Sequence, residues 1–239
     1  TISRNHGKYD RVIFHIKHRK IYNDIVKTYD IEKMSLVHAH SLFSNGYIAY
    51  KLKEKFNVPY IVAVRNTDIN VFFKYMVHLR KLGIEILKQA DKVIFLSKTY
   101  RTFVIERYIP DLLKKEIYDK SIIIPNGIDD FWLQNKGTSN NLNEPKKINL
   151  LTVGDISRNK NQLRTIKAIK LLQKKGYKIK YTVVGKVKDK KVYKKIKDLS
   201  YVQYIPYTSK ENLLDIYREN DIFVMPSMTE TFGLVYAEA

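Results

Sequence analysis

The 239-residue chain contains no cysteine, and all of its apolar stretches are short. Without cysteine, neither a disulfide framework nor a thiolate metal site can form. No stretch approaches the roughly 18 apolar residues that a membrane-spanning helix needs, and no signal peptide is visible. We therefore expect a cytoplasmic protein of one or two domains. The chain also lacks an initiator methionine and a glycine cap after its last predicted helix, so we expect a piece of a longer protein.

Acidic residues are scarce, because 24 Asp and Glu stand against 44 Lys and Arg, giving a net charge of +20. Residues 151–200 hold sixteen of the cations and three of the acids, and 186–198 is predicted to form a basic amphipathic helix. Such a helix has a solvated outer face, or it binds anionic lipid or nucleic acid. No stacking motif, helix-turn-helix or zinc pattern accompanies it, so no nucleic-acid partner is expected.

A second feature points to a membrane surface. In the stretch FFKYMVHLRKLG at 72–83, aromatic and apolar residues are interspersed with cations. This pattern and the net charge predict peripheral attachment to an anionic bilayer, at the inner face of the plasma membrane.

Short apolar strands alternate with amphipathic helices along the whole chain. In the first half, strands are predicted at 11–17, 35–40, 58–64, 92–97 and 121–127, and helices at 20–33, 45–56, within 70–90 and near 100–108. In the second half, strands are predicted at 148–154, 178–185, 201–206 and 221–227, and helices at 161–175, 186–198, 210–219 and from about 232. The alternation predicts an α/β fold with parallel sheets covered by helices on both faces.

The polar segment NKGTSNNLNEPKK at 135–147 interrupts this alternation and is predicted to be a linker. It separates a first Rossmann-like domain at 1–134 from a second at 148–239. The first strand of the first domain is expected to be missing, and the second domain is expected to be truncated.

Polar residues follow the predicted strands, at the sheet edge where open α/β sheets bind ligands. In the last segment, an apolar strand leads into a Ser/Thr-rich turn, and Gly233 opens a helix whose first backbone N–H groups are free. Glu230 in the turn and Glu238, about two helical turns onward, can approach one ligand from two sides. The strand-end residues are His38, His40, Arg65, Asn66, Thr67, Asp68, 155–160, Lys186 and Glu230.

Three blocks together resemble the retaining glycosyltransferases of the GT-B fold, family 4 type. PSMTETFGLVYAEA is similar to the family's block of two glutamates eight residues apart. LLTVGDISRNKNQLRTIKAIKLL resembles its phosphate loop and following helix, and SIIIPNGID resembles the segment that leads into the linker. VHAHSLFSNGYIAYKLKEKFNVPYIVAVRNTDIN also resembles the acceptor-domain core, so the similarity covers most of the chain.

The resemblance implies how a nucleotide-activated sugar would bind. Lys160 matches the lysine that contacts the diphosphate and stabilises the leaving group in place of a metal. Asp155 stands where relatives carry an arginine, and Arg158 is the expected substitute. Glu230 is expected to orient hydroxyls of the donor sugar, and Glu238 to bind the ribose. The other expected donor contacts are Gly154, Lys186, Val187, Phe232, Gly233 and Leu234.

The first domain departs from the family after its third predicted strand, where relatives carry His-Gly and this chain reads Arg65-Asn66. Arg65 is expected to hold a phosphate or carboxylate on the acceptor, because a guanidinium binds such groups bidentately. His40, Asn66 and Asp68 are assigned to the same acceptor side, and His38 is expected to be structural.

The sequence therefore predicts a metal-independent, retaining hexosyltransferase without a bound cofactor. It would move a sugar from a nucleoside diphosphate sugar to a glycan or lipid-linked acceptor, in surface polysaccharide biosynthesis. Glu230 and Glu238 are not expected to form a glycosidase pair, since both would bind the donor. Two alternatives stay open: a nucleotide-sugar epimerase or phosphorylase of the same build, and a non-catalytic basic protein that binds membrane or nucleic acid.

Overall fold

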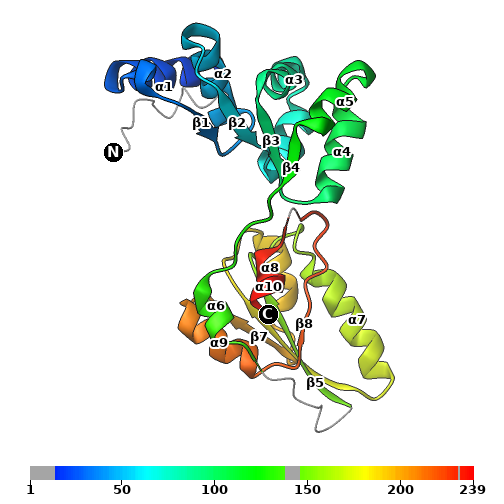
Figure 1. Cartoon of the computed structure of the whole chain (residues 1–239). Helices are drawn as coiled ribbons and strands as arrows, with labels where there is room; N and C mark the ends of the chain where they lie inside the picture. The colour runs from blue at the N-terminus through cyan, green and yellow to red at the C-terminus, as the bar shows by residue number, and fades with distance from the viewer. Residues whose placement is uncertain (1–13, 138–145, 231) are drawn as a thin grey trace. The chain divides into compact units, whose positions relative to one another are not determined.

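A computed structural model describes residues 14–137, 146–230 and 232–239. The chain divides into two compact units, residues 1–126 and 127–239. In the described residues, each unit contains one four-stranded sheet whose neighbouring strands are parallel (Figure 1). The predicted α/β class with two parallel sheets is confirmed.

In the first unit the sheet follows chain order, β1-β2-β3-β4. Its strands are β1 (Val37–Ala39), β2 (Tyr60–Ala63), β3 (Lys92–Phe95) and β4 (Ser121–Ile123). Its helices are α1 (Phe14–Thr28), α2 (Ser44–Phe56), α3 (Arg80–Gln89), α4 (Lys98–Tyr108) and α5 (Asp111–Asp119), with the shorter segments η2 (Ile31–Lys33), η3 (Asp68–Phe73) and η4 (Val77–Leu79).

The core of the first unit forms where strands β2 and β3 meet helices α3 and α4. Val62, Phe95 and Val104 are completely buried in it. Tyr60 is buried as well, and its hydroxyl donates a 2.6 Å hydrogen bond to the carbonyl of Ile86, so the polar end of the ring is satisfied.

In the second unit the strand order is β7-β6-β5-β8, so the chain reverses direction across the sheet between β5 and β8. The strands are β5 (Lys147–Val153), β6 (Lys178–Val184), β7 (Val202–Ile205) and β8 (Ile222–Phe223). The helices are α6 (Asp130–Gln134), α7 (Gln162–Lys174), α8 (Lys190–Ile196), α9 (Lys210–Arg218) and α10 (Leu234–Glu238).

Successive residues of β5 face opposite sides of this sheet, as the pleat requires. Leu150 packs in a cluster with residues of α7 and α8, whereas Leu151 packs in a second cluster with residues of α9. Helices therefore cover both faces of the second sheet, as predicted.

The strand predicted at 11–17 is wrong for the residues that the structure describes. Helix α1 begins at Phe14, and residues 11–13 lie outside the described residues. Phe14, Ile21 and Ile25 recur at helical spacing and pack with residues of α2, whereas the local Val-Ile-Phe-His-Ile sequence favours a strand. Tertiary packing overrides that local preference.

Two predicted helices are shorter than expected. The helix within 70–90 is divided into η3, η4 and α3, and Arg80 Nε donates a 2.6 Å hydrogen bond to the carbonyl of Phe73 at the break. The basic helix at 186–198 is reduced to α8, because the Asp189 carboxylate caps it by accepting from the N–H groups of Lys191 and Val192.

The boundary between the units falls at residues 126 and 127, before the predicted domain end at 134. Helix α6 belongs to the second unit, where the rings of Trp132 and Tyr217 lie 5.6 Å apart and Lys210 forms an ion pair with Asp129. Most of the predicted linker at 135–147 lies outside the described residues.

Candidate functional site

The second sheet reverses its strand order between β5 and β8, and open α/β sheets bind ligands outside the strand ends at such a point. Two loops lie there, 154–161 after β5 and the described residues of 224–233 after β8. The predicted catalytic residues Lys160 and Glu230 belong to one loop each. The strand order, which the sequence alone does not show, places them together.

Lys160 and Glu230 are in direct contact. The Lys160 Nζ lies 2.7 Å from Glu230 Oε2, and the two side chains are 20% and 28% exposed. An ammonium in this position can bind a phosphate, and the carboxylate can accept hydrogen bonds from sugar hydroxyls. In this structure each neutralises the other.

Asn159, which the sequence interpretation did not single out, holds the two loops together. Its Oδ1 accepts hydrogen bonds from the N–H and hydroxyl of Thr229, and its Nδ2 donates to the Thr229 carbonyl. Its carbonyl accepts from the N–H of Met228 at 2.7 Å. Asn161 adds a bond from its Nδ2 to the Pro226 carbonyl at 3.1 Å. These bonds fix the positions from which Lys160 and Glu230 extend.

Two glycines let the strand ends approach each other. Gly185 has φ +147°, and a Cβ there would lie 2.2 Å from the carbonyl oxygen of Gly154. Gly154 has φ +148°, and a Cβ there would lie 3.4 Å from Lys160 Cε. Only glycine fits at 185, and the Lys160 side chain passes directly over Gly154.

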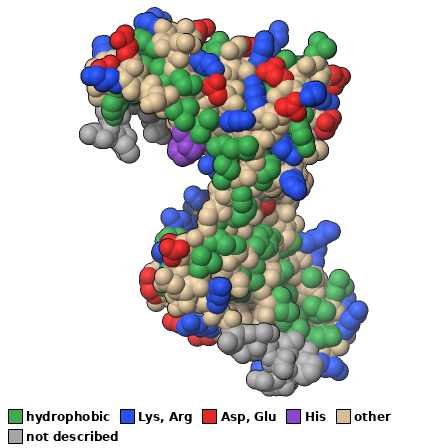
Figure 2. All heavy atoms as spheres, viewed as in Figure 1, with side chains coloured by type: hydrophobic (Ala, Val, Ile, Leu, Met, Phe, Trp, Pro, Cys, Tyr) green, Lys and Arg blue, Asp and Glu red, His purple; other side chains and the backbone are tan. Residues whose placement is uncertain are grey.

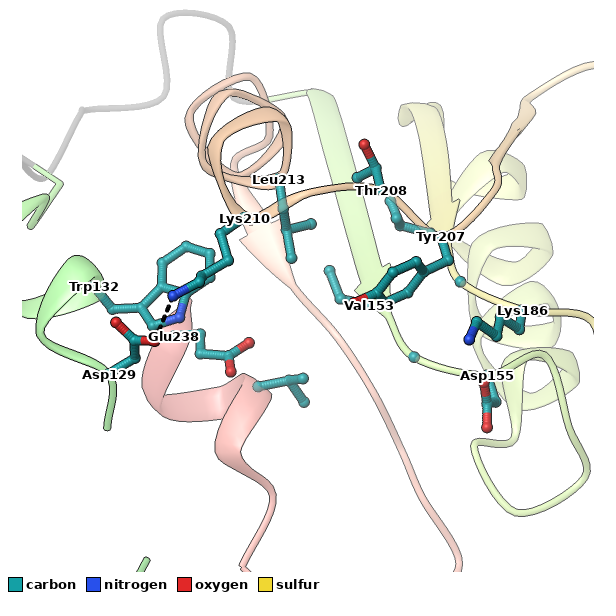
Figure 3. Close-up of a pocket in the computed structure, with 14 residues that line it drawn as sticks. Asp129, Trp132, Val153, Asp155, Lys186, Tyr207, Thr208, Lys210, Leu213 and Glu238 are labelled. Carbon is teal, nitrogen blue, oxygen red and sulfur yellow. Dashed lines mark hydrogen bonds and ion pairs between the residues drawn. The ribbon is translucent and has the colours of Figure 1, made fainter. Parts of the chain in front are cut away.

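Gly154, over which the Lys160 side chain passes, also lines a cavity of about 370 Å³. Figure 3 shows side chains that line this cavity. Its apolar wall includes Trp132, Val153 and Leu213, and its polar groups include Lys186 and Glu238. The full lining is Asp129, Trp132, Val153, Gly154, Asp155, Val184, Gly185, Lys186, Tyr207, Thr208, Lys210, Leu213, Val235 and Glu238. An apolar cavity with a few polar groups suits a small ligand with one flat, apolar part.

Charged groups are placed at two sides of the cavity, as Figure 3 shows. On one side, burial and then the charge of Asp129 raise the pKa of Glu238. Asp129 itself is paired with Lys210, whose Nζ lies 2.5 Å from its carboxylate. On the other side, the Lys186 ammonium lies 4.7 Å from the centre of the exposed Tyr207 ring. Glu238 and Lys186, which were both predicted to contact the donor, therefore line the same cavity.

Other predicted donor residues are placed differently. Arg158 is 78% exposed and its Nε lies 3.4 Å from Asp189, the cap of α8, so its side chain is directed to that cap. Val187 pairs with Ile156 in an isolated bridge and packs in the core. Helix α10 begins only at Leu234, so Glu238 lies little more than one turn into it.

Phe232, Gly233 and Leu234 lie at the start of α10. Gly233 has φ +69°, and a Cβ there would lie 3.1 Å from Glu230 Cγ, so a side chain at 233 would press on Glu230. Phe232 is partly buried and Leu234 is exposed.

In the first unit, Asp68 is buried, and its carboxylate holds two loops together. The carboxylate accepts from the N–H groups of Leu42 at 3.0 Å, Phe43 at 3.1 Å and Arg65 at 2.8 Å. Burial raises the pKa of Asp68, and these hydrogen bonds act in the opposite direction. Asp68 therefore positions the loops after β1 and β2, and its side chain is directed to the interior instead of toward an acceptor.

The other acceptor-side residues lie at the same edge. Arg65 Nε donates to the carbonyl of His40 at 3.2 Å, and its Nη1 donates to Asn126 Oδ1 at 3.0 Å. Asn66 is partly buried, and its Oδ1 accepts from Nδ2 of Asn70. His38 and His40 are exposed, with ring centres 4.1 Å apart. In the described residues, no three His, Asp or Glu side chains gather as metal ligands.

Two family models match this chain. Residues 2–130 match the family described as Glycosyltransferase Family 4, and residues 135–239 match Glycosyl transferases group 1. An uncharacterized glycosyltransferase of Methanocaldococcus jannaschii is 26% identical over 262 residues, covering 99% of this chain and 65% of the relative. An uncharacterized 41.2 kDa protein from a cps region of Klebsiella pneumoniae is 28% identical, covering 90% and 60%. This chain thus spans about two thirds or less of these relatives.

Among solved structures, the catalytic domain of starch synthase IV from Arabidopsis thaliana, bound to ADP and acarbose, has a TM-score of 0.63. The match covers 98% of this chain and 60% of that one at 14% identity, so it shows a shared fold. With more than half of the sequence matched to one family and the fold shared, the chain belongs to glycosyltransferase family 4, with the GT-B fold.

Proposed function

We propose that this chain carries the donor site and the acceptor side of an enzyme that transfers a sugar from a nucleoside diphosphate sugar, with retention and without a metal. The acceptor is a glycan or a lipid-linked molecule. One observation carries the proposal: Lys160 and Glu230 meet at the strand reversal, beside a cavity large enough for a nucleoside.

The geometry supports the following proposed roles. The nucleoside occupies the cavity, where Glu238 accepts hydrogen bonds from the ribose and Lys186 lies next to the base. The diphosphate passes over Gly154 to the Lys160 ammonium, which stabilises the charge of the leaving group. Glu230, released from Lys160, then accepts hydrogen bonds from the sugar hydroxyls. Backbone N–H groups of 232–234 are further proposed hydrogen-bond donors to the diphosphate. Arg158 is proposed to join them, which requires its side chain to leave Asp189.

The relatives support a sugar donor and a polysaccharide setting. The starch synthase structure holds ADP and acarbose, a nucleoside diphosphate and a glycan analogue. The Klebsiella pneumoniae relative comes from a cps region. We therefore place the enzyme in surface polysaccharide biosynthesis.

Trp132 gives a direct test, because it is the chain's single tryptophan and it lines the cavity. Nucleoside diphosphate sugars are titrated while tryptophan fluorescence and the thermal unfolding temperature are followed. Saturable quenching with a rise in unfolding temperature for at least one of them is expected. No response to any UDP-, ADP-, GDP- or dTDP-sugar contradicts the donor site.

Transfer itself is tested with Lys160→Ala and Glu230→Gln, which should each lower the transfer rate by about 100-fold or more, because each removes a transition-state contact. The anomeric configuration of the product reports retention. Turnover of the donor sugar without any acceptor indicates the epimerase alternative, and no turnover of any donor sugar by the wild type indicates a non-catalytic protein. Transfer rates that are unchanged in both variants contradict the roles of Lys160 and Glu230.

We also propose peripheral attachment to the cytoplasmic face of an anionic membrane. Tyr75 and Val77, in the basic stretch predicted for this role, are 69% and 58% exposed, and Lys74 lies between the aromatic residues. In Figure 2, however, Lys and Arg side chains are scattered over the visible face without forming one continuous patch. No helix in the described part of the chain has the length and apolar content of a membrane-spanning segment. Binding to phosphatidylglycerol vesicles that high salt reverses is expected; equal binding to neutral vesicles contradicts it.

A further inference from the structure

Arg65 is a partly buried cation whose guanidinium donates its hydrogen bonds to uncharged groups. Its guanidinium donates to the carbonyl of His40 and to the side-chain amide oxygen of Asn126, and in the described residues no carboxylate lies within ion-pair distance of it. These two bonds use Nε and Nη1 and leave the donors of Nη2 available. A held guanidinium with free donors is a ready receptor for an anion.

Two imidazoles lie at the same sheet edge. The rings of His38 and His40 stand 4.1 Å apart with 32° between their planes, and both side chains are exposed. Desolvation and then the charges of His40 and Arg65 lower the pKa of His38, so His38 interacts electrostatically with both groups. A bound anion would favour the protonated form of His38 and so raise its pKa.

Asp68 is the acidic residue at this edge, and its position strengthens the case. Its carboxylate is buried and accepts N–H groups of Leu42, Phe43 and Arg65. It therefore fixes the Arg65 backbone from the inside. The Arg65 charge opposes the rise in the pKa of Asp68, so the two groups attract each other, but in the described residues they form no ion pair.

We propose that Arg65, His38 and His40 bind a phosphoryl group on the acceptor, so that this enzyme selects a phosphorylated acceptor. A phosphoryl group offers three acceptor oxygens to three cationic or cation-forming donors. This inference rests on the proposed function, because it names the acceptor class of that transfer. The phosphoryl group belongs to a sugar phosphate or to the head group of a lipid carrier.

The test follows the histidine resonances of the chain by NMR during titration with glucose 6-phosphate, with glucose as the uncharged control. Saturable shifts of the His38 and His40 signals are expected with glucose 6-phosphate alone, and the pKa of His38 rises on binding because the anion favours the imidazolium. A second arm uses phosphatidylglycerol vesicles. Signals that respond to the vesicles and not to the sugar phosphate assign the phosphoryl group to a lipid.

Arg65→Gln is expected to weaken glucose 6-phosphate binding at least tenfold, and Arg65→Lys is expected to retain part of it. Arg107→Gln, the same change at an exposed residue of α4, is the matched control and should leave binding unchanged. Histidine signals that ignore both ligands, or equal binding by the wild type and Arg65→Gln, overturn the proposal. Trp132 reports donor binding in the other unit, so failure of this site and failure of the donor site are read separately.

Discussion

The two units use different side chains to hold together the loops at the ends of their strands. In both units, one residue joins the loops that follow two neighbouring strands through hydrogen bonds to backbone groups. The first unit uses the buried carboxylate of Asp68, which accepts three N–H groups. The second uses the amide of Asn159, which both accepts and donates at Thr229. A buried carboxylate suits neighbours that only donate hydrogen bonds, whereas an amide suits neighbours that include both donors and acceptors.

The cations at the two edges differ in a way that bears on function. Lys160 is paired with the carboxylate of Glu230, whereas Arg65 contacts a carbonyl and an amide oxygen. A ligand anion in the second unit must exchange with Glu230, and that exchange frees the glutamate for another part of the ligand. In the first unit, the charge of the buried Asp68 acts on Arg65, but among the described residues an incoming anion has no ion pair to break there. We call the edge of the second sheet at Lys160 and Glu230 the donor edge, and it is closed because its cation is held in an ion pair. We call the edge of the first sheet at Arg65 the acceptor edge, and it is open because its cation is bonded to uncharged groups.

The largest expected effect is on stability, in Asp68→Ala. Removing the carboxylate leaves three backbone N–H groups without their partner, and each buried unsatisfied donor costs about 1–3 kcal/mol. We expect the free energy of unfolding of the first unit to fall by about 3 kcal/mol or more, measured by urea denaturation with far-UV circular dichroism.

The control for this prediction is Asp68→Asn, which keeps one acceptor oxygen and should lose about half as much. Trp132 fluorescence follows the second unit in the same samples. A loss below about 1 kcal/mol in Asp68→Ala would show that water replaces the carboxylate, and Asp68 would then not be the equivalent of Asn159.

The second prediction concerns the paired cation. Lys160→Met should weaken binding of the matching nucleoside diphosphate about 100-fold, near 2.7 kcal/mol, because the diphosphate loses its ammonium partner. Titrations of UDP, ADP and GDP followed by Trp132 fluorescence measure it. Lys167→Met, on the exposed side of α7, is the matched control. If both variants lose the same affinity, the effect comes from the lower net charge and not from a contact between Lys160 and the diphosphate.

Part of this arrangement could be predicted from the sequence, because parallel α/β sheets bind their ligands at the carboxyl ends of the strands. The pattern identified Lys160, Glu230 and Glu238, and the structure brings Lys160 to Glu230 and Glu238 to the adjoining cavity. Long periodic segments such as α2 and α7 were also predicted close to their observed bounds.

Other parts could not be predicted, for identifiable physical reasons. Asn159 and Trp132 act through contacts with Thr229 and Tyr217, which are 70 and 85 residues away, and no local spacing signals such contacts. Asp68 was assigned to the acceptor because a strand-end carboxylate looks the same whether it faces inward or outward. Residues 14–17 were predicted as a strand because their local sequence favours one, whereas helix α1 is stabilised by packing of Phe14, Ile21 and Ile25 with residues of α2.

The third prediction tests the amide at the donor edge. Asn159→Ala removes the bonds to Thr229, so the loop that carries Glu230 loses its fixed distance to Lys160. We expect about tenfold weaker binding of the nucleoside diphosphate sugar, near 1.4 kcal/mol, with an unchanged far-UV spectrum. Asn159→Asp keeps the two accepting bonds and should lie between the variant and the wild type. Full affinity in Asn159→Ala would mean that the Asn161 bond to Pro226 suffices.

The smallest expected effect is the most direct test of the closed and open edges. Glu230→Gln removes the charge that competes for Lys160, so a bare nucleoside diphosphate should bind about two- to fivefold more tightly, since a partly exposed ion pair is worth up to about 1 kcal/mol. The nucleoside diphosphate sugar should gain less or lose affinity, because its hydroxyls lose the carboxylate acceptor. The ratio of the two dissociation constants, from Trp132 fluorescence, is therefore the informative quantity. If Glu230→Gln leaves the ratio of the two dissociation constants at its wild-type value, Glu230 does not close the donor edge. The difference between Lys160 and Arg65 would then be one of geometry alone.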